Sequence, residues 1–124
     1  MTMEFAGERT LMRVFIGESD RCHSGRHRGK PLYEGILLTL RERGFAGATV
    51  TRGIAGFGAS ARIHTAKVLR LSLDLPIIVE VVESEERIQE LLPELDGMIG
   101  GGLITLEKAR VVLYRPATEG EQEV

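Results

Sequence analysis

The chain has 124 residues, 43% of them hydrophobic, and its 16 Lys and Arg against 18 Asp and Glu give a formal net charge of −2. This length suits one compact domain, and the balanced charge favours neither nucleic acid nor an anionic membrane. The only cysteine, Cys22, excludes an intramolecular disulfide. The apolar runs are far shorter than the ~20 residues that span a bilayer, and charged residues interrupt any signal-peptide core near the start. We therefore expect a cytoplasmic domain without a nucleic-acid partner.

The first half of the chain predicts a strand, a helix and a second strand. Residues 1–8 form a polar flank that we expect to be flexible. The β-forming residues 11–16 predict a strand that stops at Gly17. After Pro31, apolar residues recur at spacings of three and four and predict a helix, with Gly44 as its C-terminal cap. Residues 48–52 alternate as in a half-exposed strand.

The second half predicts the same order of elements. A long connection, residues 53–74, contains several glycines and leads into residues 77–82, the clearest strand of the chain. Ser84 is a good N-cap for a helix, and Pro93 predicts a kink or an early end of that helix. Three glycines at 100–102 precede a long or broken strand over 103–114. The acidic residues 116–124 are expected to form a flexible tail of a domain over residues 9–115.

This order predicts an α+β domain with a ferredoxin-like βαββαβ fold, in which a four-stranded antiparallel sheet carries two helices on one face. Side chains alternate between the two faces of a strand, and residues 77–82 are largely apolar on both faces. Two helices cover only one face, so the other face predicts a homo-oligomer. The alternative is a twisted sheet that exposes scattered valines.

The segment from Arg52 to His64 is the first candidate binding site. Its glycines Gly53, Gly56 and Gly58 can adopt positive φ and leave amide groups open to an anion. The side chains that could contact a phosphate there are Arg52, Arg62 and His64. The segment is neither a P-loop nor a GxGxxG motif, so a loop kept polar by Gly and Arg is an equally open interpretation.

The basic segment 22–30 is the second candidate. Cys22, His23 and His27 are potential ligands for copper or zinc, although nothing nearby completes a tetrahedral set and we therefore predict no metal site. The preferred interpretation is a loop that helps to hold phosphate, with Lys30 at the N-terminus of the following helix.

Catalysis has little support in the sequence. Cys22 and His23 are adjacent in the chain, which does not establish a nucleophile–base pair. Glu80 lies in a strand among apolar residues and could carry a proton or face a polar interface. We expect no enzyme; a small enzyme that uses Glu80 or His64 as a proton carrier is the weakest alternative.

Five segments together resemble the PII-like family catalogued as domain of unknown function 190. They are GKPLYE at 29–34, GATVTRGIAGFG at 47–58, RIH at 62–64, LSLDLP at 71–76 and GLITLEKARV at 102–111. The resemblance extends from about Leu11 to Tyr114. One departure is a few extra residues, among them Arg26, His27 and Arg28, before the GKPLYE segment.

The resemblance implies a ferredoxin-like trimer that binds an adenine nucleotide (AMP, ADP or ATP) in clefts between subunits and requires no cofactor. It further implies that residues 54–67 form a flexible signalling loop whose target could be a membrane transporter or channel. Carried over to this chain, the candidate ligand contacts are Lys30, Arg52, Gly53, Gly56, Phe57, Gly58, Arg62 and His64. A metal-binding trimer that holds copper or zinc is the alternative function.

Overall fold

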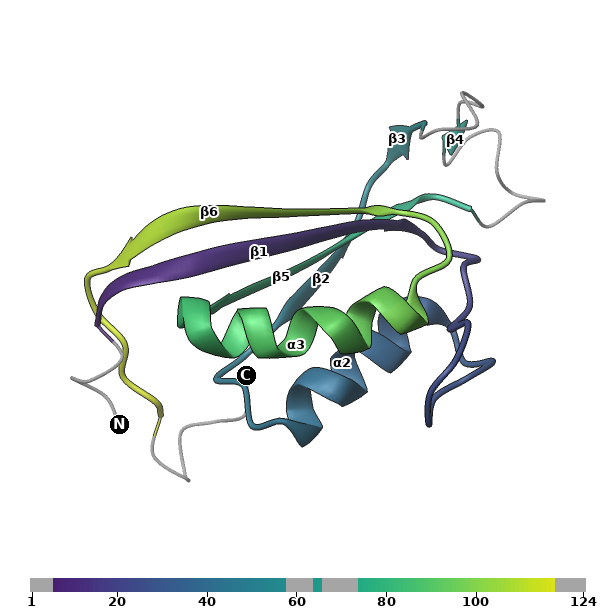
Figure 1. Cartoon of the computed structure of the whole chain (residues 1–124). Coiled ribbons are helices and arrows are strands. Elements are labelled where there is room, and N and C mark those ends of the chain that lie inside the picture. Colours follow the sequence, from purple (N-terminus) through teal and green to yellow (C-terminus); the bar gives the residue numbers. More distant parts are fainter. Residues whose placement is uncertain (1–5, 58–63, 66–73, 118–124) are drawn as a thin grey trace.

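The computed structural model describes residues 6–57, 64–65 and 74–117. Its main part is a four-stranded antiparallel sheet in the order β2-β5-β1-β6, with both helices on one face (Figure 1). The elements are β1 (Gly7–Gly17), α2 (Leu32–Glu42), β2 (Thr49–Arg52), β3 (Ala55–Gly56), β4 (His64–Thr65), β5 (Pro76–Glu83), α3 (Glu85–Met98) and β6 (Leu103–Val111). The predicted ferredoxin-like fold is confirmed.

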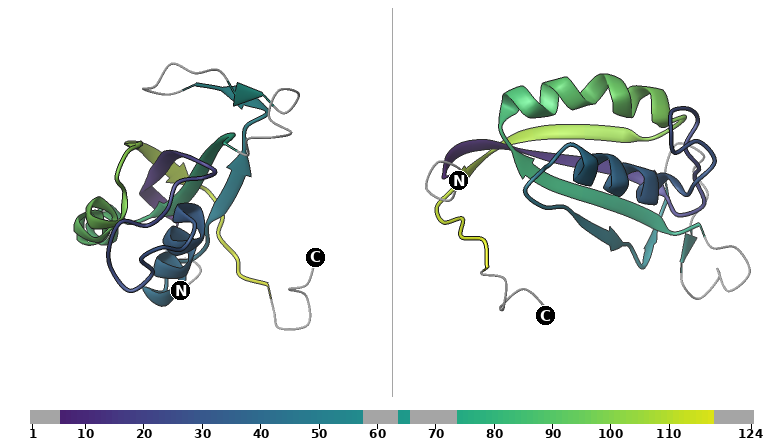
Figure 2. Two further views of the ribbon diagram at one scale, coloured as in Figure 1. Left: turned by 90° about the vertical axis from the view of Figure 1, so that its right-hand side faces the viewer. Right: turned by 90° about the horizontal axis from the view of Figure 1, so that it is seen from below.

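The two central strands are buried on their helix-covered side. In the antiparallel register Met12 faces Val81 and Val14 faces Val79, and all four side chains are buried. Because alternate side chains point the same way, this one face of β1 and β5 forms the floor of the core. Figure 2 shows both helices lying against this face.

The helix boundaries follow the local signals, with one exception. Helix α2 begins directly after Pro31, and Gly44 just beyond it has φ 75°, the left-handed conformation typical of a residue past a helix end. Ser84 caps α3, since its hydroxyl accepts a hydrogen bond from the amide of Arg87 at 3.3 Å.

The prediction of an early end at Pro93 is wrong, because α3 continues to Met98. The proline is exposed to solvent, so water can satisfy the carbonyl that loses its helical partner. The buried stripe of Ile88, Leu91 and Leu95 holds the turns on both sides of the proline against the core. The predicted final strand is also shorter than expected and ends at Val111.

The face of the sheet opposite the helices is less apolar than the sequence indicated. Leu11, Phe15, Ile78 and Val82 are half-buried there, as predicted. In its centre, however, the guanidinium of Arg13 makes ion pairs with two carboxylates, which belong to Glu80 at 2.7 Å and Glu107 at 2.9 Å. The hydrogen bond that Arg13 donates to Glu80 raises the pKa of Arg13. A charged cluster surrounded by apolar side chains therefore forms the open face.

Candidate ligand site at one end of the sheet

The antiparallel topology brings four strand ends together. The last residues of β1 and β2 lie at the same end of the sheet as the first residues of β5 and β6. The connections 18–31, 53–75 and 99–102 therefore start or finish there. Figure 1 shows the small β3–β4 ribbon projecting from this end, on the side away from the helices.

Arg52 is the predicted ligand contact that this arrangement places best. Its guanidinium donates to Glu18 at 2.9 Å, while the arginine side chain is 55% exposed and the glutamate side chain 21%. The second carboxylate oxygen of Glu18 is buried and has no hydrogen-bond partner among the described residues. Arg52 is thus an accessible cation that the Glu18 carboxylate holds in place. It lies where β2 ends and the chain enters the β3–β4 ribbon, a point (residues 52–54) that we call the root of the ribbon.

Gly53 and Gly56 do not provide the positive φ that was predicted; they allow a close approach to Pro76. Neither has positive φ; both pack against the ring of Pro76 at the start of β5. A Cβ at Gly56 would lie 2.9 Å from Cγ of that proline, and the Gly53 amide donates to the proline carbonyl at 2.7 Å. The glycines are needed here because the ribbon root lies close to β5.

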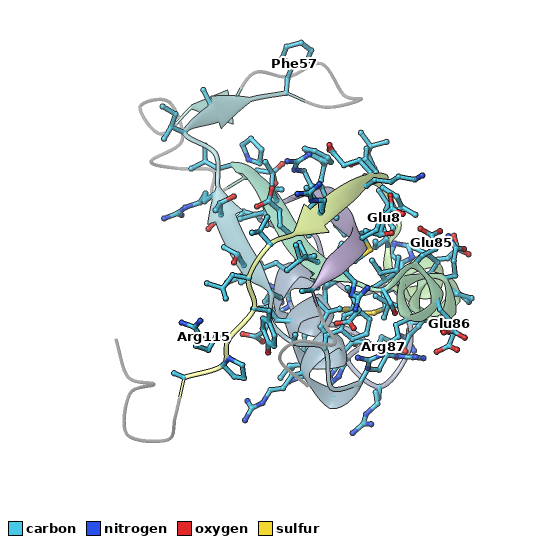
Figure 3. All side chains as sticks on the ribbon, turned by 90° about the vertical axis from the view of Figure 1, so that its left-hand side faces the viewer. Glu8, Phe57, Glu85, Glu86, Arg87 and Arg115 are labelled. Carbon is cyan, nitrogen blue, oxygen red and sulfur yellow. The ribbon has the colours of Figure 1, made fainter. Side chains whose placement is uncertain are left out.

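Phe57 lies at the exposed end of the described ribbon. It is 68% exposed, and nearby Ile54 is 81% exposed. Figure 3 shows the Phe57 ring pointing away from the body of the protein. Two large apolar side chains in water are unfavourable in isolation, and such a pair is typical of a contact surface for another molecule.

Four other predicted contacts are placed less completely. Gly58 and Arg62 lie outside the described residues. His64 pairs with Gly56 across the ribbon, which brings its backbone to the same segment. Lys30 is exposed on the separate connection before α2.

The connection that carries Lys30 is a tight hairpin instead of an open loop. The amide of Cys22 donates to the Lys30 carbonyl at 2.9 Å, and the Gly29 amide donates to the Cys22 carbonyl at 3.0 Å. The extra residues Arg26 and Arg28 are exposed at its tip. Burial raises the pKa of the Cys22 thiol.

The metal ligands suggested by sequence do not come together as a set. Within the described ranges, no group of three or more His, Cys, Asp or Glu side chains could hold a metal ion. Cys22 and His27 are buried, whereas His23 is exposed.

Sequence reasoning missed the acidic residues of this sheet end. The first of these is Glu18, and the second is Asp74. Asp74 accepts hydrogen bonds from the amide and the hydroxyl of Ser19 at 3.2 and 2.8 Å. These bonds connect the β1–α2 connection to the segment before β5. The signal that could have found them is the position of Glu18 directly after the predicted strand end at Gly17, at the same sheet end as Arg52.

The family model DUF190, described as "Uncharacterized ACR", matches residues 9–111. The chain belongs to this family. A UPF0166 protein of Aquifex aeolicus is 39% identical over 105 residues, which cover 85% of this chain and 94% of that protein. A UPF0166 protein of Methanocaldococcus jannaschii is 33% identical over 102 residues, which cover 82% and 89% of the two chains.

Solved structures with the same fold come from the PII-like group. CPII of Thiomonas intermedia K12, a nitrogen regulatory PII-like protein bound to ADP, AMP and bicarbonate, has a TM-score of 0.58 at 16% identity. The match covers 84% of this DUF190 chain and 88% of CPII. A CPII structure bound to ADP and bicarbonate has a TM-score of 0.50 at 15% identity. The predicted membership of the DUF190 family and the predicted fold are confirmed. None of the described helices has the length and apolar character needed to cross a membrane.

Proposed function

We propose that this DUF190 protein is a regulator that binds an adenine nucleotide at the Arg52 end of the sheet. The observation that carries the proposal is the accessible guanidinium of Arg52 at the root of a projecting ribbon. A phosphate there would gain charge-assisted hydrogen bonds. The nucleotide-bound state of CPII, which shares the fold, supports the choice of ligand class.

The test is calorimetry with AMP, ADP and ATP, combined with the melting temperature at millimolar nucleotide. A ligand that binds the folded state raises the melting temperature by mass action. Arg52→Ala should weaken binding about tenfold or more, since a hydrogen bond to a charged group contributes about 1.5–3 kcal/mol. Arg43→Ala is the matched control, because Arg43 is paired with Glu94 on the helical layer. No heat and no melting shift with any nucleotide would end the proposal.

We further propose that the ribbon carries the signal to a target protein, such as a membrane transporter or channel. The exposed Ile54 and Phe57 support this role. Replacing both by Ser should abolish target binding and leave nucleotide affinity within about twofold. If nucleotide affinity falls as far as in Arg52→Ala, the two side chains belong to the ligand site instead.

The proposed assembly is a homotrimer whose subunits cover the open sheet face. The half-buried apolar side chains there, together with the exposed Leu103, Val112 and Leu113, support burial against other copies. Sedimentation at micromolar concentration tests this, and a stable lone protomer would refute it. A cytoplasmic location stays a prediction.

The protein is proposed to act without catalysis. Glu80, one of the two candidate proton carriers, makes an ion pair with Arg13 at 2.7 Å, which supports a structural role for its carboxylate on the open sheet face. A nucleotide-turnover assay with Glu80→Gln as a control tests this directly. Turnover by the wild type that the variant loses would overturn it.

A further inference from the structure

The hairpin between β1 and α2 (residues 21–30) carries positive charge that the proposed function does not use. Its exposed cations are Arg21, Arg26, Arg28 and Lys30. The sequence contains no Asp or Glu at positions 21–33. Because the whole chain has a formal net charge of −2, the rest of the molecule carries a net negative charge. The hairpin is therefore a basic surface on an acidic protein.

Hydrogen bonds hold this hairpin against the end of α3. The amide of His23 donates to the Met98 carbonyl at 2.8 Å, and the Ser24 hydroxyl donates to the Gly97 carbonyl at 2.6 Å. Figure 1 shows the connection between β1 and α2 at the sheet end from which the ribbon projects, but on the side of the helices. The cations are thus carried on an ordered support, which lowers the entropy lost when a partner binds.

The extra residues 26–28 alternate between solvent and the interior. His27 is 7% exposed, and its Nε2 atom lies 3.3 Å from a carboxylate oxygen of Glu42, so this residue fixes the hairpin on α2. Arg26 and Arg28 on either side of it are exposed. The Arg26 guanidinium lies 3.8 Å from Glu42 and its side chain is 73% exposed, a pairing that contributes little in water. The buried histidine therefore anchors two guanidinium groups that face outward.

The chemistry of the hairpin favours a short acidic protein segment as its partner. Guanidinium groups bind carboxylates in a bidentate geometry. The only exposed ring of the hairpin is that of His23, which lies against Gly100, and no large apolar side chain is exposed there. A surface that stacks on nucleic-acid bases or enters a membrane interface would present such side chains. A long polyanion or a charged membrane would also meet the acidic remainder of the molecule, whereas a few carboxylates fit on the hairpin alone.

We propose that the hairpin 21–30 is a docking surface for an acidic segment of a partner protein, with Arg26 and Arg28 as its principal contacts. The surface uses neither Arg52 nor Glu18. Binding at the hairpin is therefore independent of the proposed nucleotide site.

The test is fluorescence anisotropy of a labelled hexaglutamate peptide titrated with the protein, with hexaglutamine as the uncharged control peptide. We expect the wild type to bind hexaglutamate and not hexaglutamine, with an affinity that falls as the salt concentration rises. The double variant Arg26→Gln, Arg28→Gln keeps two polar side chains and should weaken binding about five- to tenfold, as expected for two exposed ion pairs. Wild-type protein that does not distinguish the two peptides would overturn the proposal.

The double variant Lys108→Gln, Arg110→Gln is the matched control, because it removes the same charge from two exposed cations of β6. It should bind hexaglutamate like the wild type, and so should Arg52→Ala. Equal losses in the two double variants would show attraction by net charge alone, and an equal loss in Arg52→Ala would place the peptide at the nucleotide site; either result overturns the proposal. Tighter binding of phosphatidylserine vesicles or of a single-stranded oligonucleotide through Arg26 and Arg28 would also overturn it.

Discussion

Replacing Glu18 by Gln tests whether the Glu18 carboxylate competes with a phosphate for the guanidinium of Arg52. The Glu18 carboxylate accepts a hydrogen bond from one nitrogen of Arg52 at 2.9 Å, so a phosphate that approaches Arg52 competes with a negative charge already in place. The change to Gln keeps the shape of the side chain and removes the competing negative charge. We therefore expect tighter nucleotide binding by Glu18→Gln, in contrast to the loss expected of Arg52→Ala.

The size of the effect follows from the exposure of the pair. Arg52 is 55% exposed and Glu18 is 21% exposed, so solvent screens much of the attraction, as in surface ion pairs worth about 0–1 kcal/mol. A gain of about 1 kcal/mol corresponds to roughly a fivefold lower Kd. The gain should shrink at high salt, because ions screen the repulsion between Glu18 and the phosphate.

Isothermal calorimetry with ATP at low and high salt measures the difference. Glu94→Gln is the control, because Glu94 is paired with Arg43. The ATP affinity of this variant should match that of the wild type. An unchanged or weaker affinity in Glu18→Gln would refute the competition and would indicate that Glu18 positions Arg52 for its ligand. If the wild type and both variants fail to bind, the proposed function itself is at fault.

Three further predictions concern the stability of the fold. Gly56→Ala places a Cβ 2.9 Å from the proline at the start of β5, and urea unfolding should show a loss of about 1–3 kcal/mol from overpacking. Arg87→Ala removes the cation that lies 3.3 Å from the buried carboxylate of Glu83 and should cost about 2–4 kcal/mol by the same measurement. The hydrogen bond from Thr10, followed by that from Gln89, lowers the pKa of Glu85, so Thr10→Val should raise this pKa in an NMR titration. Because the folded-state pKa lies below the unfolded one, the stabilisation by Glu85 is present above the unfolded pKa and is lost as the pH falls through the folded one.

Each of these predictions has a defined failure. Arg43→Ala breaks an ion pair that is exposed on both sides and should cost less than about 1 kcal/mol; equal losses in Arg43→Ala and Arg87→Ala would show that burial of Glu83 is unimportant. A normal Glu85 pKa in the wild type would exclude the Thr10 hydrogen bond in solution. Wild-type stability of Gly56→Ala would mean that the ribbon root can move away from β5.

The order and type of the main elements were predictable because their signals are local. Apolar spacing defined α2, a run of β-branched residues defined β5, and Ser84 marked the start of α3. Pro93 misled the prediction because the cost of proline in a helix depends on tertiary packing and on solvent access to the freed carbonyl, neither of which is encoded within a few residues.

The candidate site was predictable only in part. The Gly-rich segment and the family resemblance pointed to Arg52 and Phe57 as ligand contacts, but they did not predict that Phe57 is 68% exposed. Glu18, by contrast, is 34 residues away from Arg52 in the chain, and only the sheet topology brings the two together. The roles of Gly53 and Gly56 depend on the proximity of Pro76, a contact between distant segments that composition does not report.

The root of the ribbon is fixed from two sides, and this makes it suitable for transmitting a local change. The Gly53 amide is bonded to Pro76, and the Glu18 amide donates to the Leu75 carbonyl at 2.9 Å. The Glu18 side chain also holds Arg52, so a single residue connects the segment that leaves β2 with the segment that enters β5. A ligand that breaks the Arg52–Glu18 ion pair therefore removes a contact shared by residue 52, before the 53–75 connection, and by Glu18, which is bonded to Leu75 at the end of that connection. Because the backbone bonds between β2 and β5 do not depend on that ion pair, the sheet can keep its register when the pair is broken.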